Sequence, residues 1–160
     1  MTQESSRKKP KTLLNVTGKV QQQAWTEAFA KKSADAFQKS LAQDVVLEAN
    51  TLVQPVEAID QVKIVMATAS AIYEELVFTQ EASNGPRTYL EWQARALGGI
   101  ELFGVTVLSR NAKGEIARVA IHHRPLNAAL RFSAELGNRL RGRVDGGYFF
   151  NGQPQASDAT

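Results

Sequence analysis

The two histidines of the chain are adjacent, His122 and His123, and they lie at the end of an apolar stretch. Pro125 follows two residues after His123 and stops this stretch. An imidazole exchanges a proton near neutral pH, so either side chain could act as a general base or bind a metal ion. Successive side chains of a strand point to opposite faces, which prevents the pair from sharing one ion. The chain has no cysteine and no third histidine. We therefore expect no metal site and no cofactor.

Alternation along a predicted strand over 116–124 assigns the two imidazoles to different faces. The more apolar set is Ala117, Val119, Ile121 and His123, and the more polar set is Ile116, Arg118, Ala120 and His122. The apolar set should face the core. His123 is therefore the candidate catalytic residue, with a buried neutral imidazole as the alternative, and His122 should face solvent or a partner subunit.

Other side chains should surround the same space as His123. Six residues lie on the apolar stripes of the helices or on the inner faces of the strands, and we predict that they bind the substrate: Trp25, Phe29, Met66, Tyr73, Trp92 and Thr106. The alternative is that they only pack in the core. The carboxylate of Glu48 should face outward, because alternation sets it opposite Val45 and Leu47.

The elements that position these residues follow from the spacing of apolar residues and from turn residues. Helical spacing predicts helices over 20–32 and 56–74, a short helix that starts near Ser33 or Asp35, and a last helix over 126–140. Strands are expected over 44–50, 75–82, 87–97, 100–110 and 116–124. Helices followed by a long antiparallel meander indicate an α+β fold, in which a strongly bent sheet wraps around the helices and leaves a cone-shaped hollow.

Length and charge narrow the classes of protein. The 160 residues fit one domain. The pI of 9.3 comes from a basic segment, because four cations and one acid lie in residues 1–11 and the rest holds 15 of each sign. We therefore expect no nucleic-acid partner. No stretch of the sequence approaches the roughly 18 apolar residues of a membrane span, so we also expect no integral membrane segment and a cytoplasmic location. The expected organisation is a basic disordered tail over 1–18, a domain over 19–125, a packing helix over 126–143 and a polar tail over 144–160.

The segments "FQKSLAQDVVLEAN" and "GIELFGVTVLSRNAKGEIARVAIHHRP" resemble the nuclear transport factor 2-like superfamily, and SnoaL-like domains within it. The resemblance covers about 20–125 and implies a cone-shaped α+β barrel, which often dimerises through its sheet. Members include ketosteroid isomerases, limonene epoxide hydrolases, scytalone dehydratases and polyketide cyclases, and some act only as binding modules.

The catalytic residues of two of these enzymes are not found at the matching positions. The acids of the isomerases correspond to Ala49 and Thr106, and the inward Arg and two Asp of the epoxide hydrolases to Trp92, Ala94 and Ile121.

Two functions follow from this reading of the sequence. The first is binding of a small hydrophobic molecule, with activity as an isomerase, cyclase, dehydratase or hydrolase in which His123 moves or polarises a proton. The alternative is a non-catalytic ligand-binding or protein-interaction module. We expect a homodimer through the convex sheet face, where the apolar side chains of Phe103, Val105 and Val107 should lie.

Overall fold

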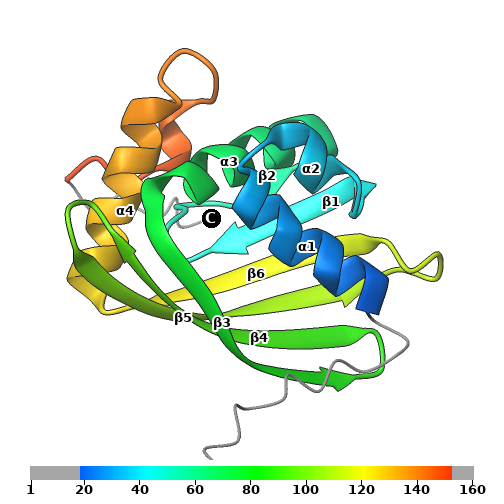
Figure 1. The fold of residues 1–160 in the computed structure, drawn as a ribbon. Helices are drawn as coiled ribbons and strands as arrows, with labels where there is room; N and C mark the ends of the chain where they lie inside the picture. Colours follow the sequence, from blue (N-terminus) through cyan, green and yellow to red (C-terminus); the bar gives the residue numbers. More distant parts are fainter. Residues whose placement is uncertain (1–18, 153–160) are drawn as a thin grey trace, which may run out of the picture.

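A computed structural model describes residues 19–152 of the chain, which fold into a curved sheet with helices against its concave face (Figure 1). The sheet has the order β2-β1-β6-β5-β4-β3, and it is open because β2 and β3 are its edges. Strands β1 and β6 run parallel, and the other neighbours run antiparallel. The predicted α+β class, with a bent and mostly antiparallel sheet, is confirmed.

The strands follow the predicted meander closely. Their bounds are β1 Leu41–Ala49, β2 Val56–Glu57, β3 Tyr73–Asn84, β4 Arg87–Ala96, β5 Ile100–Arg110 and β6 Ile116–Arg124. The turn between β4 and β5 requires its two glycines, since Gly98 and Gly99 have φ angles of 81° and 100°.

The helices are α1 Lys19–Lys31, α2 Ala34–Gln38, α3 Ile59–Ile72 and α4 Leu126–Arg139. The hydroxyl of Ser33 caps α2 by accepting a hydrogen bond from the Ala36 N–H at 3.2 Å. Among residues 19–152, no helix is both long and apolar enough to span a membrane.

The long helix is shorter at both ends than the predicted helix over 56–74. Val56 and Glu57 instead form β2, which pairs with Leu47 and Val46 of β1. Ala58 then has a φ of 68° and caps α3. At the other end Tyr73 is already extended, so its side chain lies where the helix passes into β3. At Val56 and Glu57, pairing with β1 outweighs the local helical pattern.

The alternation predicted for β6 holds at its second half and fails at its start. Ile116, expected on the polar face, is fully buried, whereas His122 is exposed and His123 is buried. The reason is an irregularity in the pairing with β5, in which Ser109 pairs with Arg118 but Arg110 already pairs with Ile116. One extra residue on β6 reverses the alternation of side chains.

The packed structure extends beyond residue 143, where we expected a polar tail to begin. Val144 and Phe149 are buried in the core. Phe149 lies against the backbone of α4 at Gly137, where a Cβ atom would be 2.9 Å from the Phe149 Cβ. The Phe150 N–H donates to the Ser133 hydroxyl at 2.9 Å, and the Val53 N–H donates to the Tyr148 carbonyl at 2.8 Å. Residues 144–150 therefore join α4 to the loop after β1. The expected tail over 1–18 lies outside the described residues.

Candidate functional site

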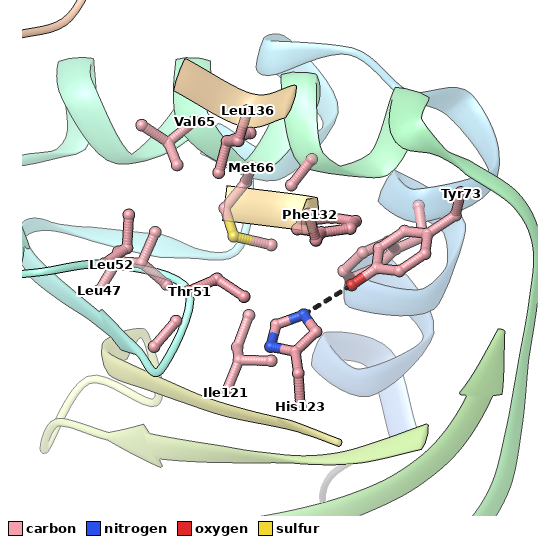
Figure 2. Close-up of a pocket in the computed structure, with 13 residues that line it drawn as sticks. Leu47, Thr51, Leu52, Val65, Met66, Tyr73, Ile121, His123, Phe132 and Leu136 are labelled. Carbon is pink, nitrogen blue, oxygen red and sulfur yellow. Dashed lines mark hydrogen bonds between the residues drawn. The ribbon is translucent and has the colours of Figure 1, made fainter. Parts of the chain in front are cut away.

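A small cavity lies between the concave face of the sheet and the helices, at the level of His123 (Figure 2). It is lined by Phe29, Leu47, Ala49, Thr51, Leu52, Val65, Met66, Ala69, Tyr73, Ile121, His123, Phe132 and Leu136. Its volume is about 20 Å³, which is enough for one water molecule or one polar group. The expected hollow is therefore largely filled, because Phe132 and Leu136 of α4 occupy the space beneath the sheet.

The predicted site residues fall into two groups. His123, Tyr73, Met66 and Phe29 line the cavity. The remaining three are buried but lie outside this lining: Trp25, Trp92 and Thr106. Trp25 packs edge-on against Phe29 and Phe37, with ring centroids 5.4 and 5.5 Å apart. The Trp92 indole N–H donates to the Thr106 hydroxyl at 3.1 Å, so these two inward-facing side chains satisfy each other.

Asn50, directly after β1, fixes the backbone and the ring of His123. Its amide Nδ2 donates to the His123 carbonyl at 2.9 Å, and its Oδ1 accepts from the His123 backbone N–H at 2.9 Å. This pair of bonds determines the orientation of the amide, since the reversed orientation would set donor against donor. The Oδ1 atom also lies 3.2 Å from His123 Nδ1. Because Oδ1 can only accept, Nδ1 carries the imidazole proton.

The other ring nitrogen of His123 contacts Tyr73. The Tyr73 hydroxyl lies 2.9 Å from His123 Nε2 (Figure 2). Since Nδ1 carries the proton of the neutral ring, Nε2 is an acceptor and the Tyr73 hydroxyl donates to it. Asn50, His123 and Tyr73 thus form one chain of hydrogen bonds, which runs from the end of β1 through β6 to the start of β3.

The electrostatics of this chain favour its neutral form. Burial, and to a smaller degree the neighbouring His122, lower the pKa of His123 to about 3. Burial raises the pKa of the Tyr73 phenol above its ordinary value. Transfer of a charge into an apolar surrounding is unfavourable, so both groups stay uncharged near neutral pH.

Aromatic side chains hold the imidazole in place from two sides. The rings of Trp92 and Phe132 have centroids 5.2 and 5.3 Å from that of His123, and Phe132 also lies 5.0 Å from Tyr73. Trp92 can lie there because residue 104 on the neighbouring strand is glycine. A Cβ atom on Gly104 would be 2.2 Å from the Trp92 ring. The sequence therefore supplies a glycine where the ring beside His123 needs the space.

Among residues 19–152, no carboxylate side chain lines the cavity. Glu48 faces outward, as alternation predicted, and forms an ion pair with Arg118 on the convex side. Within the described residues, no three His, Asp or Glu side chains lie close enough together to hold a metal ion. The described residues that line the cavity thus offer a ligand hydroxyl groups, one imidazole and apolar contacts.

Three residues around the cavity did not emerge from the sequence: Asn50, Thr51 and Phe132. An asparagine that ends a strand is a usable signal, because its amide can satisfy a neighbouring strand's backbone. It gives no indication of which strand lies beside it. Thr51 is buried and lines the cavity, and no hydrogen bond joins its hydroxyl to any other described residue. Phe132 follows the apolar spacing of the last helix, whose position over the cavity depends on the tertiary fold.

No protein-family model matches the chain, and no curated protein matches it in sequence. Solved structures do match it. An uncharacterised bacterial protein with a cystatin-like fold from Silicibacter pomeroyi has a TM-score of 0.73 at 20% identity, over 78% of this chain and 87% of its own. A steroid delta-isomerase from Pseudomonas aeruginosa has a TM-score of 0.72 at 21% identity, over 81% of this chain and 95% of its own.

A third match is a protein from Jannaschia sp. described as a SnoaL-like polyketide cyclase, with a TM-score of 0.57 at 16% identity over 71% of this chain and 92% of its own. Identities this low establish a common fold and leave the activity open. The chain therefore has the cystatin-like cone fold of the nuclear transport factor 2-like and SnoaL-like proteins, which the resemblance in its sequence implied.

Proposed function

We propose that the protein binds a small, uncharged and mainly apolar molecule in the cavity beside His123. The observation that carries the proposal is the neutral hydrogen-bond chain of Asn50, His123 and Tyr73, which reaches a cavity with apolar walls. An apolar pocket with a few polar groups is the common form of a small-molecule site. A charged ligand would be disfavoured, since none of the described residues that line the cavity carries a charge near neutral pH to offset its desolvation.

Binding is favoured over acid–base catalysis by the state of His123. A general base that works near neutrality needs a pKa near the working pH. Burial lowers the pKa of His123 to about 3, and its Nε2 is already engaged by Tyr73. Among residues 19–152, no carboxylate lines the cavity to take over that role.

A second candidate is catalysis on the same kind of ligand, as an isomerase, cyclase, dehydratase or hydrolase. The contact of the Tyr73 hydroxyl with His123 Nε2 at 2.9 Å favours it, because the Tyr73 oxygen could take a proton from a ligand as its own proton passes to Nε2, which leaves an imidazolium at His123 and the anion on the ligand. The shared fold with a steroid delta-isomerase and a protein described as a SnoaL-like polyketide cyclase is in line with this candidate. Its test is turnover: replacement of His123 by Ala should abolish any activity found, and unchanged turnover would remove His123 from the mechanism.

A ligand larger than one polar group has to displace side chains. Phe29 and Leu52 line the cavity and are only partly buried, so they can move toward solvent. Met66 is fully buried and unbranched, and its side chain adapts to the shape of a neighbour. We propose that the polar end of the ligand lies at Tyr73 and that its apolar part takes the space of these three side chains.

The binding proposal is tested by titrating the ¹⁵N-labelled protein with cyclohexanol and with cyclohexanone, followed by amide NMR shifts. At least one of the two should bind saturably and shift amides of residues 47–52, 65–73 and 121–123. Ala69→Leu fills the cavity and should weaken binding at least tenfold, whereas Ala71→Leu, at an exposed position of the same helix, should bind like the wild type. Two flat titrations, or equal binding by both variants, would contradict the proposal.

We also propose a homodimer formed through the convex face of the sheet. Phe103, Val105 and Val107 are partly exposed there, and Arg124 lies over the Phe103 ring at 5.2 Å. Polar side chains such as Glu91, Gln93 and Arg95 surround this apolar row. A mixture of apolar and polar groups of this kind is typical of interfaces between separately folded subunits.

A further inference from the structure

We propose that the cavity selects ligands that donate a hydrogen bond, such as alcohols, over ligands of equal size whose polar group only accepts one, such as ketones and ethers. This inference rests on the proposed binding function and specifies its ligand class. It follows from the direction of the hydrogen bonds along Asn50, His123 and Tyr73.

The direction is set at Asn50. The His123 backbone presents one donor and one acceptor to the Asn50 amide, and both bonds are 2.9 Å long. Only one orientation of the amide satisfies both, and it turns Oδ1 toward His123 Nδ1 at 3.2 Å. A bare Nδ1 would set two lone pairs against each other, so the proton lies on Nδ1 and Nε2 is bare.

The proton of Tyr73 is therefore committed to His123. Its hydroxyl lies 2.9 Å from the bare Nε2, and the imidazole is buried with no other donor joined to that nitrogen among the described residues. The Tyr73 oxygen then offers only lone pairs to the cavity. A ketone could bond to Tyr73 only if the hydroxyl turned away from Nε2, which would leave a buried acceptor unpaired.

The hydroxyl of Thr51 does not remove this preference. It is free to rotate and can donate or accept, so it serves an alcohol and a ketone alike. An alcohol can use the Tyr73 oxygen as well as the Thr51 hydroxyl, whereas a ketone can use Thr51 alone. Sites that leave a buried polar group unpaired discriminate strongly against the wrong analogue.

The experiment compares cyclohexanol with cyclohexanone, which differ in the direction of their hydrogen bond and little in size. We expect the wild type to bind the alcohol about tenfold or more tightly, and Thr51→Val to widen that ratio. ¹⁵N NMR of the histidine ring should report a protonated Nδ1 and a bare Nε2 for His123. Asn50→Leu, which frees the ring to take the other tautomer, should lower the ratio toward one, while Gln54→Leu, in the same loop and exposed, should leave it unchanged.

The outcomes separate the two proposals. Equal affinities for the alcohol and the ketone, or a proton on Nε2 of His123 in the wild type, would overturn the donor preference and leave the binding function standing. A preference that persists in folded Asn50→Leu would overturn the positioning role of Asn50. Binding of neither compound would overturn the binding function and this inference with it.

Discussion

At the scale of single residues, the buried imidazole of His123 links the stability of the fold to pH. The folded protein keeps this ring neutral down to about pH 3, whereas the unfolded chain protonates it below about pH 6.5. Between these values the unfolded state binds one more proton, so the free energy of unfolding falls as the pH falls, by at most about 1.4 kcal/mol per pH unit. Between pH 6.5 and 5 the free energy of unfolding of His123→Gln should therefore fall by about 1.6 kcal/mol less than that of the wild type, because the unfolded imidazole is only half protonated at pH 6.5.

The measurement is urea unfolding at several pH values in that window, where few carboxylates titrate. His122→Gln is the matched control, because His122 is exposed on the other face of the same strand and its loss should leave most of the slope. Equal slopes for the wild type and His123→Gln would show that the imidazole of His123 protonates in the folded state.

Residue-level reasoning from the sequence succeeded where the pattern is local. The alternation of side chains in β6 was sufficient to predict that His123 faces inward and His122 outward, because a strand has a period of two residues. It failed at Ile116, where one extra residue in the pairing with β5 reverses the faces. It also missed Asn50, which bonds to a residue 73 positions away. That contact depends on the parallel pairing of β1 with β6, and no local pattern predicts which strands are neighbours.

At the scale of elements, boundaries were predictable where glycine, proline or a cap marks them. The predicted strand over 100–110 matches β5, and the predicted strand over 116–124 matches β6. The short strand β2 was missed, because two residues that pair with β1 leave no periodic signal. The packed segment after α4 was missed for a related reason: it is short and has no periodic pattern, although it carries two buried side chains, Val144 and Phe149.

This C-terminal segment should stabilise α4, the helix that fills the cone. Phe149→Ala removes a buried ring that packs on Gly137, and we expect a loss of about 3 kcal/mol in the free energy of unfolding. Hydrogen exchange should rise first in α4. Phe150→Ala is the control, since this side chain is only partly buried and its backbone bond to Ser133 is retained. A Phe149→Ala variant as stable as Phe150→Ala would mean that α4 stays in place without the segment.

At the scale of the whole molecule, the fold was predictable and the size of its interior was not. Helices followed by a meander favour one α+β arrangement, and a bent sheet leaves a space beneath it. How much of that space stays open depends on where α4 packs. Its Phe132 lies against Tyr73 and His123, which reduces the hollow to about 20 Å³. The amphipathic pattern of a helix predicts that one face is buried, and it does not predict against which surface.

The last prediction concerns dimer formation through the convex face of the sheet. If Val105 lies at the centre of a homodimer interface, Val105→Glu would bury an unpaired carboxylate there, and a charge without a partner is strongly unfavourable in such a place. Sedimentation velocity should find a dimer for the wild type and a monomer for Val105→Glu, with the circular dichroism spectrum unchanged. Leu126→Glu adds the same charge at an apolar residue that is 73% exposed at the start of α4 and lies outside the row of Phe103, Val105 and Val107, and it should remain a dimer. A monomeric wild type, or a Val105→Glu variant that stays dimeric, would place the contact between subunits elsewhere or remove it.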